Sequence, residues 1–408
     1  MNQTTCRGCG APDLKVVLDL GAMPLANAIL REEDLRRPEP RYPLVLAYCD
    51  QCWLVQITET VPPELMFREY TYFSSVSDAF VEHSRIIAER LTGERNLGPD
   101  SLVIELASND GYLLAHYVRA GVPVLGIDPA RNIAEVASAR GVPTIAEFFT
   151  SELAGELAAS GRTADVVHAN NVIAHIPDLN GFVAGIARIL KSDGIAVIET
   201  PYVRELVERL EFDTIYHEHL FYHSLTALSV VFERNGLTIV DVERIPVHGG
   251  SLRVVAMRTG AGEAGEAVRA LLDEEVAVGL CSPEYYAAFA GRVEVLGRDL
   301  HAMLTDLQSQ GHLVAAYGAA AKGAVLLNAF NIGPDLISFV VDRSPHKQGF
   351  LMPGVHIPIV DTDQLVALQP DECLLLAWNF ADEILAQQAE YRRLGGKFII
   401  PVPKLTLV

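Results

Sequence analysis

The chain has 408 residues, half of them apolar, which is enough for about two or three domains that each bury a core. Its 52 acidic and 32 basic side chains give a formal net charge of −20, and this charge opposes any broad attraction to nucleic acid or to anionic membranes. An anionic small molecule stays compatible with it, because one phosphate needs only a few local donors.

No segment approaches the roughly 20 consecutive apolar residues that a membrane-spanning helix requires. The polar start, Met-Asn-Gln-Thr-Thr at residues 1–5, lacks the apolar core of a secretory signal. We therefore expect a soluble, cytoplasmic protein that binds neither nucleic acid nor a membrane. The sequence leaves its oligomeric state open.

Two pairs of cysteines have the spacing of metal ligands. They are Cys6 with Cys9 and Cys49 with Cys52. A Cys-x-x-Cys pair holds two thiolates close enough to share one ion, and two pairs complete the four-sulfur set of structural zinc. A redox dithiol or a pair of disulfides would fit a cytoplasmic chain poorly. We predict structural zinc in a small β-rich module over residues 1–66.

After two prolines at positions 62 and 63 the pattern becomes helical, and Tyr70 and Tyr72 lie in this stretch. A tyrosine at a domain boundary can present its hydroxyl to a cleft, although packing is the commoner role. Both tyrosines are candidate site residues.

A strand, a tight turn and a helix start follow over residues 101–112, and a second strand ends in Asp128. In such a strand–helix–strand unit an acid at the end of the second strand can accept both ribose hydroxyls of a nucleotide. Further strands near residues 165–171, 195–199, 237–245 and 251–257 continue the alternation. We predict an α/β domain with a doubly wound sheet over residues 67–258.

The first turn of this domain carries acids where a dinucleotide site has glycines. Glu105, Asn109 and Asp110 precede its only glycine, Gly111, so the usual glycine pattern is absent. Such a turn repels a pyrophosphate, whereas S-adenosylmethionine carries a sulfonium and an ammonium in place of phosphates. We therefore favour S-adenosylmethionine over a nicotinamide dinucleotide. The candidate cofactor residues are Glu105, Ala107, Asn109, Gly111, Asp128, Phe148, Asn170 and Asn171.

A cluster of histidines, tyrosines and one carboxylate lies directly downstream, over residues 211–225. Histidine is the side chain best matched to moving protons at neutral pH, and a neighbouring carboxylate or phenol can orient it. The alternative is that these histidines only cap and solvate a loop. If the segment is extended, His217 and His219 share one face, so periodicity does not choose between them. The cluster comprises Tyr216, His217, Glu218, His219, Tyr222 and His223.

Two further positions carry polar side chains next to predicted turns. His175 follows a strand end, at the edge where open α/β sheets bind ligands, although ordinary turn capping is equally compatible. His248 precedes a glycine pair between two strands, where either a polar site or a plain hairpin turn fits.

A second α/β unit follows a glycine-rich boundary and a long helical stretch that ends near residue 310. A strand at residues 312–317 leads through a turn into a helix, and Lys322 there could hold a phosphate together with the helix amides. The next strand ends at Asp342 and is followed by Arg343 and Lys347, and a later strand ends at Trp378. We predict a second Rossmann-like domain over residues 259–408.

Four motifs in this order resemble the S-adenosylmethionine-dependent sugar C-methyltransferases that act on TDP-linked 4-keto-deoxysugars in antibiotic pathways. The paired cysteines are similar to the family's N-terminal zinc domain, and Glu-Leu-Ala-Ser-Asn-Asp-Gly at 105–111 is similar to its cofactor loop. Tyr-His-Glu-His at 216–219 resembles its catalytic segment. Gly-Ala-Ala-Ala-Lys-Gly at 318–323, with the segment 341–349, resembles its nucleotide-sugar domain.

The resemblance implies a class I methyltransferase-type sheet flanked by a zinc module and a C-terminal nucleotide-sugar domain. It implies that His219 is the general base that removes the proton at C3 of the sugar, with Tyr216 and Glu218 around it. It also implies that Tyr70, Asn171 and His175 line the substrate cleft. The substrate candidates are Tyr72, Tyr222, His248, Lys322, Asp342, Arg343 and Lys347.

Three other functions stay open at this point. His223 stands where the family pattern has an aromatic residue, which is compatible with an added reduction of the C4 ketone by NADPH. A nucleotide-sugar oxidoreductase or epimerase without methyl transfer would use the same fold. A zinc-stabilised scaffold that only binds a nucleotide would need none of the histidines.

Overall fold

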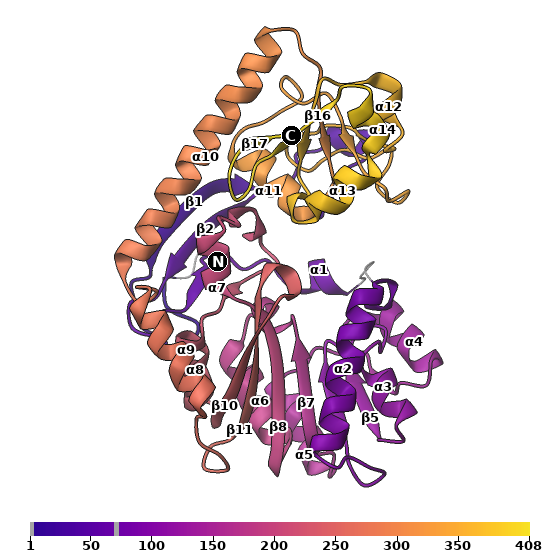
Figure 1. Ribbon diagram of the computed structural model, residues 1–408. Coiled ribbons are helices and arrows are strands. Elements are labelled where there is room, and N and C mark those ends of the chain that lie inside the picture. The colour runs from indigo at the N-terminus through magenta and orange to yellow at the C-terminus, as the bar shows by residue number, and fades with distance from the viewer. Residues whose placement is uncertain (1–3, 69–72) are drawn as a thin grey trace.

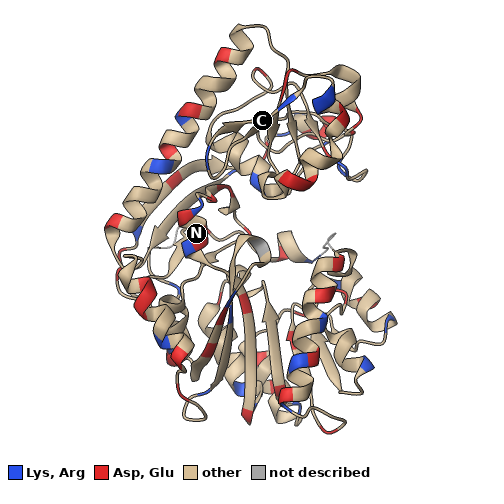
Figure 2. Ribbon diagram, in the orientation of Figure 1, with Lys and Arg blue, Asp and Glu red and all other residues tan. Residues whose placement is uncertain are grey.

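The computed structural model describes residues 4–68 and 73–408, and these fold around three β-sheets (Figure 1). The α/β class is therefore confirmed. A four-stranded sheet lies between a seven-stranded sheet and a six-stranded sheet, and the long helix α10 runs beside the four-stranded and six-stranded sheets. Among the described residues, no helix combines the length and apolarity needed to cross a membrane. Acidic side chains lie on every part of the ribbon (Figure 2).

The four-stranded sheet is antiparallel, with the order β1-β2-β3-β9. Its first three strands come from the N-terminal module, but β9 belongs to the histidine cluster more than 160 positions later. In this register Val55 faces Tyr222 and Gln56 faces Phe221. The strands are β1 (Lys15–Met23), β2 (Tyr42–Tyr48), β3 (Val55–Ile57) and β9 (Phe221–Tyr222).

The seven-stranded sheet has the order β10-β11-β8-β7-β4-β5-β6 and is parallel except for β11. Its central strands are buried along their whole length, because helices cover both faces. Its strands are β4 (Val103–Leu106), β5 (Val124–Ile127), β6 (Thr144–Ile145), β7 (Ala164–Asn170), β8 (Leu190–Pro201), β10 (Leu237–Ile245) and β11 (Ser251–Arg258). Its helices are α2 (Asp78–Glu94), α3 (Leu114–Arg119), α4 (Arg131–Ala139), α5 (Ser151–Ala159), α6 (Leu179–Ile189), α7 (Val203–Glu208) and α8 (Leu225–Arg234).

The six-stranded sheet has the order β14-β13-β12-β15-β16-β17 and is parallel except for β17. The expected strand before Asp342 is short, because only Val340 and Val341 pair with β12. The strands are β12 (Val314–Tyr317), β13 (Val340–Val341), β14 (Ile359–Val360), β15 (Glu372–Leu375), β16 (Lys397–Ile400) and β17 (Thr406–Leu407). The helices are α11 (Ala321–Ala329), α12 (Gln364–Leu368), α13 (Ala381–Gln387) and α14 (Ala389–Arg393).

Several elements join the sheets. The long helical stretch predicted before residue 310 is two helices, α9 (Glu266–Ala277) and α10 (Pro283–Ser309), and Ser282 caps the second by accepting from the Tyr285 amide. Helix α9 packs on α8 and β10, while α10 contacts both β1 and β12 (Figure 1). The connection between β1 and β2 reaches the C-terminal domain, where Leu30 forms a β-bridge with Leu351.

Short elements connect this framework to the predicted site. They are the helix α1 (Glu64–Phe67) and the 3-10 turns η1 (Glu32–Arg36), η2 (Ser74–Val76), η3 (Ile173–His175), η4 (Phe212–Thr214), η5 (Val247–Gly249) and η6 (Trp378–Phe380). Four of these, η2, η3, η4 and η6, carry residues that contact the predicted cofactor loop or the histidine cluster, as described below. The site is therefore built mostly from connections that the three sheets position.

Candidate active site and metal centre

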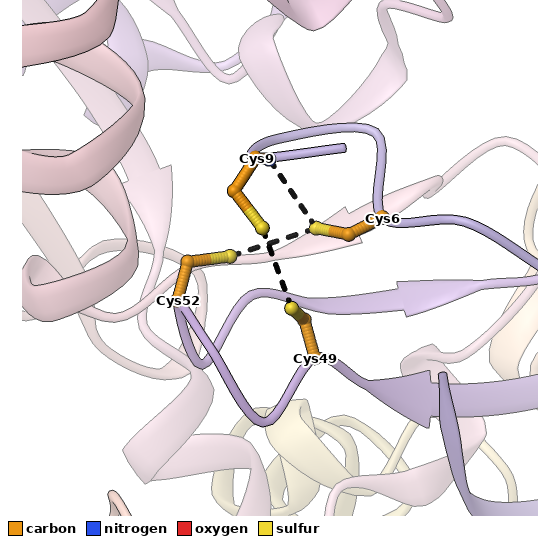
Figure 3. A group of neighbouring side chains, drawn as sticks. All are labelled: Cys6, Cys9, Cys49 and Cys52. Atoms are coloured by element: carbon orange, nitrogen blue, oxygen red, sulfur yellow. Dashed lines mark hydrogen bonds between the residues drawn. The ribbon is translucent and has the colours of Figure 1, made fainter. Parts of the chain in front are cut away.

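The four predicted metal ligands come together at one end of the small sheet (Figure 3). Their sulfur atoms all lie within 4.8 Å of one another, and the Sγ atoms of Cys6 and Cys52 and those of Cys9 and Cys49 are each 3.5 Å apart. Four thiolates around one zinc ion, with Zn–S bonds of about 2.3 Å, place neighbouring sulfurs about 3.8 Å apart. The donor set therefore fits tetrahedral zinc and leaves no ligand position for a substrate.

Each cysteine pair sits in a turn with one residue in the left-handed region. In the first turn this residue is Gly10, with φ of 78°, and in the second it is Trp53, with φ of 59°. The non-glycine conformation at Trp53 is supported by stacking, because its ring lies 5.5 Å from that of Tyr48. The second turn therefore needs no glycine, which sequence inspection alone would not predict.

The predicted cofactor loop follows β4 and is held by Asp128 at the end of β5. The Asp128 carboxylate accepts from the backbone amides of Asn109 and Ala130, both at 2.9 Å. Ala107 and Asn109 have φ of 54° and 48°, and Gly111 has φ of 77°. A Cβ at position 111 would lie only 2.9 Å from Val142 Cγ2. The loop is therefore a rigid turn whose acidic anchor faces the strand ends, as a ribose-binding acid would.

Glu105 is a fully buried carboxyl group beneath this loop. Burial is the main cause that raises its pKa well above the usual range, and the charges of Asp128, Asp110 and Glu199 raise it further. Its Oε2 has no hydrogen-bond partner within the described part of the chain. A buried carboxyl group without a counter-ion is suited to a cationic ligand, because a positive charge nearby offsets its desolvation.

The segment before α2 covers the cofactor loop. The backbone amide of Ser74 donates to Asn109 Oδ1 at 2.9 Å, and the Ser75 hydroxyl donates to Asp110. Arg140 also donates to Asp110, at 2.8 Å. Asp110 therefore faces serine and arginine and not an open site.

A short chain of ring contacts joins the predicted cofactor pocket to the histidine cluster. The Arg68 guanidinium lies 4.7 Å from the centre of the Phe148 ring. Phe67, which precedes Arg68 in the chain, packs edge-on to His175, with ring centres 5.6 Å apart. His175 in turn lies edge-on to His219, with ring centres 4.9 Å apart. The predicted cofactor and substrate residues therefore border one region, as transfer between two bound molecules requires.

The first half of the histidine cluster, residues 216–219, is a turn and not an extended strand, because the backbone amide of His219 donates to the Tyr216 carbonyl at 2.9 Å. The turn separates the two histidines. His217 is buried and donates from Nε2 to the carbonyl of Pro43, at 3.2 Å, in the zinc module. His219 is half-buried and donates from Nδ1 to the Thr214 carbonyl at 3.0 Å.

These bonds fix the tautomers, since a carbonyl oxygen can only accept. His219 therefore carries its proton on Nδ1 when neutral, and the lone pair of a base lies on Nε2. The ring of Tyr216 lies 4.1 Å from that of His219, and the Tyr222 ring lies at 6.4 Å. His175 is oriented in the same way, because its Nδ1 donates to the Glu218 carbonyl at 2.6 Å. Burial lowers the pKa of His175, which keeps it neutral.

Glu218 and His223 occupy different surroundings from His219. The Asn27 side chain of the zinc module donates to Glu218 Oε1 at 2.6 Å, and burial raises the pKa of this carboxyl group. His223 is fully buried, its Nδ1 lies 3.0 Å from the Thr200 hydroxyl, and burial lowers its pKa to about 3. A histidine in this position packs and does not exchange protons near neutral pH.

The edge of the C-terminal sheet repeats the arrangement around Asp128. Asp342 accepts from the backbone amides of Ala319 and Ser344, both at 2.8 Å. Lys347 donates to the Ala319 carbonyl at 2.7 Å, and its Nζ lies 3.9 Å from Asp342. Arg343 is exposed and pairs with Glu383 at 3.5 Å. Lys322 donates to the Asn379 side chain at 3.0 Å.

The remaining predicted site residues are two tyrosines, one histidine and two asparagines. Tyr70 and Tyr72 lie outside the described residues, and so does the side chain of His248, although its backbone belongs to η5. Asn170 and Asn171 lie at the end of β7, and each has a buried Oδ1 without a partner in the described segments. Asn171 is left-handed, with φ of 55°, which turns the chain toward η3.

Sequence reasoning missed three residues that contact the predicted site. The carbonyl that orients His219 belongs to Thr214, a backbone group that no side-chain pattern indicates. Asn27 reaches Glu218 from the other end of the chain, and Arg68 reaches Phe148. The sequence contains no signal for these three residues. It did indicate Trp378, because the strand before it was predicted to end at the ligand-binding edge of the C-terminal sheet.

Three family models match consecutive parts of the chain. They are described as "Putative zinc binding domain" over residues 6–67, "Methyltransferase domain" over residues 78–242 and "C-methyltransferase C-terminal domain" over residues 246–403. The four cysteines of the metal centre therefore lie inside the first match.

The C-methyltransferase NovU of Streptomyces niveus is 38% identical over 400 residues, which is 98% of this chain and 95% of the relative. The ubiquinone biosynthesis O-methyltransferase of Bartonella quintana (strain Toulouse) is 28% identical over 99 residues, 24% of this chain and 40% of that one. The solved magnesium protoporphyrin IX methyltransferase from Synechocystis PCC 6803 is 16% identical, with a TM-score of 0.34 over 47% of this chain and 86% of that one. At this TM-score the structural likeness carries no further weight.

The chain therefore belongs to the S-adenosylmethionine-dependent C-methyltransferase family. The full-length match confirms the resemblance that the four motifs indicated. The seven-stranded sheet is the methyltransferase sheet, and the cysteine cluster belongs to the zinc-binding module at its N-terminal side.

Proposed function

We propose that the protein transfers a methyl group to C3 of a TDP-linked 4-keto-deoxysugar in an antibiotic pathway, through an enolate that His219 generates. One observation carries the proposal. The Thr214 carbonyl fixes the proton of neutral His219 on Nδ1, so the Nε2 lone pair is the base, and the ring lies between Tyr216 and His175. A base and a phenol that can donate a hydrogen bond are the groups that enolate formation beside a ketone needs.

In the proposed reaction, His219 Nε2 takes the C3 proton, and the electrons of that C–H bond move toward the C4 ketone oxygen. Tyr216 is the side chain beside His219 that can donate to the developing oxyanion, and desolvation in its half-buried surroundings strengthens such a bond. His175 packs edge-on to His219, and its one proton stays on Nδ1, donated to the Glu218 carbonyl. When bound, S-adenosylmethionine would supply an electrophilic methyl group to C3, and S-adenosylhomocysteine would leave with the electrons of the broken C–S bond. Glu105 and Asp128 are the residues that would hold it, Glu105 toward its positive charge and Asp128 toward its ribose.

The C-terminal domain would hold the nucleotide end of the substrate. Lys322 begins α11, directly after the Gly318 turn, and Lys347 lies beside Asp342 at the neighbouring strand end. These two ammonium groups can pair with a diphosphate, while Asp342 can accept from a ribose as Asp128 does in the first domain. The domain boundaries that go with this division of labour are 1–66, 67–258 and 259–408.

The test combines product analysis with isotope exchange. The purified holoenzyme is incubated with a TDP-4-keto-deoxysugar and S-adenosylmethionine, and mass spectrometry is expected to show one added methyl, which NMR then places on C3. Without the cofactor, the wild-type protein in heavy water is expected to exchange the C3 hydrogen. His219→Ala should lose both activities.

His217→Gln is the matched control, since His217 lies two residues away and faces Pro43. Exchange by His219→Ala at the wild-type rate would contradict the assignment of the base. A product that gains two hydrogens with NADPH, and no methyl, would make the protein a ketoreductase. Stabilisation by a nicotinamide cofactor, and not by S-adenosylmethionine, would likewise identify an oxidoreductase.

A further inference from the structure

A hydrogen bond crosses from the C-terminal sheet to the catalytic segment, and the reaction above does not use it. Trp378 donates from Nε1 to Asp213 Oδ2 at 2.6 Å. Asp213 is fully buried, and Trp378 is half-buried at the end of β15. The two residues lie 165 positions apart in the chain. A buried carboxylate that accepts from an indole N–H is a directional contact, because the indole nitrogen has one donor and one geometry.

The C-terminal side of this bond borders the proposed phosphate site. The Nζ of Lys322 lies 4.4 Å from the centre of the Trp378 ring, in a cation–π contact, and donates to Asn379 at 3.0 Å. Burial raises the pKa of Asp213 to about 6, and the charge of the same ammonium opposes this rise. Lys322, Trp378 and Asp213 therefore form one continuous contact.

The other side of the bond leads to the base. Asp213 precedes Thr214 in the single turn η4, and the Thr214 carbonyl accepts from His219 Nδ1 at 3.0 Å and from the Tyr222 hydroxyl at 3.4 Å. A second contact holds η4 to the same domain, because the ring of Phe212 lies 4.9 Å from that of Phe330 at the end of α11. The C-terminal domain therefore contacts two neighbouring residues of η4, Phe212 and Asp213.

We propose that Trp378 and Asp213 are positioning residues that fix the Thr214 carbonyl, and through it His219, relative to the domain that holds the nucleotide. The inference rests on the proposed function, since it takes His219 as the base and Lys322 as a phosphate ligand. It adds a role for two residues that touch neither substrate nor cofactor. An error of about 1 Å in the place of a catalytic group can cost roughly 100-fold in rate, so a buried directional bond is a fitting restraint.

Two substitutions remove this bond from opposite ends. Trp378→Phe keeps an aromatic ring and deletes the donor, while Asp213→Leu deletes the acceptor in a similar volume. Each should lower kcat for methyl transfer, and the rate of C3 exchange in heavy water, by roughly 10- to 100-fold. The Kd for S-adenosylmethionine should stay within about twofold, because Glu105 and Asp128 lie in another part of the fold.

Rescue and coupling separate positioning from general damage. Asp213→Asn keeps an oxygen that can accept from the indole, and should retain kcat within about threefold. The double variant Trp378→Phe/Asp213→Leu should be no slower than the slower single variant, because both remove one interaction. Phe380→Ala is the matched control, since Phe380 is 56% exposed two residues after Trp378 and should leave kcat unchanged.

The outcomes distinguish this inference from the proposed function. Wild-type protein that neither methylates the sugar nor exchanges its C3 hydrogen overturns the proposed function. Active wild-type protein with an unchanged kcat in Trp378→Phe overturns the positioning role alone. So does a loss that appears only in the KM for the nucleotide sugar, which would make Trp378 a substrate contact. If Asp213→Leu does not fold, Trp378→Phe and Asp213→Asn still decide the question.

Discussion

His219 and His223 lie four residues apart, yet their surroundings differ in burial and in hydrogen-bond partner. The Thr214 carbonyl accepts from half-buried His219, whereas His223 is buried against Thr200 and the backbone bridge to Tyr202. At the residue scale, burial and the identity of one hydrogen-bond partner decide which imidazole can move a proton. The histidine that departs from the family pattern is thus the structural one.

The pH dependence of stability should reveal His223. Its pKa is about 3 in the folded protein and about 6.5 in the unfolded chain, so the unfolded chain takes up a proton first as the pH falls. Its contribution is therefore complete above pH about 6.5 and lost below it, by roughly 2 kcal/mol at pH 5. The free energy of unfolding, measured in urea, should fall less between pH 7 and pH 5 in His223→Asn than in the wild-type protein. The exposed His301→Asn variant should behave as wild type, and equal losses in all three proteins would contradict the assignment.

Glu105 should show a conflict between stability and binding. Burying its ionisable carboxyl group costs free energy, and Glu105→Gln replaces that group with a neutral amide of similar shape. We expect the apo variant to unfold at an equal or higher temperature, and its affinity for S-adenosylmethionine to fall about tenfold, roughly 1.4 kcal/mol. Calorimetric titration with the cofactor measures the second effect. Unchanged affinity would show that the carboxylate does not face the bound cation.

At the element scale, the strand β9 explains why a zinc module belongs to this enzyme. Its two residues complete the small sheet by pairing with β3, and His219 precedes it by only two positions. Asn27 and Pro43 of the same module contact Glu218 and His217. The zinc-binding module thus packs against the segment that carries the proposed base, His219.

Removal of zinc should therefore abolish activity from a distance. Cys9→Ser, or chelation of the wild-type protein, is expected to lower the melting temperature by roughly 5 °C or more and to stop methyl transfer. The rate at which the backbone amides of residues 219–223 exchange with heavy water should rise at the same time. Cys281→Ser, which alters a thiol outside the cluster, should retain zinc and activity. Full activity in zinc-free protein would refute the link through β9.

In the whole molecule, several separate contacts connect the three sheets. The bridge from Leu30 to Leu351, the bond from Trp378 to Asp213 and the helix α10 each cross between them. Interfaces of this kind make the domains unfold together, because separating them exposes buried groups from both sides.

Scanning calorimetry should accordingly show one transition. S-adenosylhomocysteine and TDP, added separately, are expected to shift that same transition upward, and together to shift it further. The zinc-loaded full-length protein is the sample. Two resolved transitions, each answering to one ligand, would mean that the domains are energetically separate.

The sequence by itself determined the parts whose signals are local. Period-2 and period-3.6 patterns located strands and helices of both α/β domains, the two Cys-x-x-Cys pairs gave the four cysteines that cluster, and Asp128 and Asp342 marked the two strand ends that are predicted to bind ligands. Local spacing is enough there, because each feature is made by residues close together in the chain.

Only the tertiary structure separated His217 from His219. An extended segment would put His217 and His219 on one face, but the turn that starts at Tyr216 sends them apart. Thr214, Asn27 and Trp378 act through contacts between distant parts of the chain, and a backbone carbonyl leaves no mark in a side-chain pattern. Pairing between segments 165 positions apart depends on how three sheets pack together, and spacing along the chain does not contain that information.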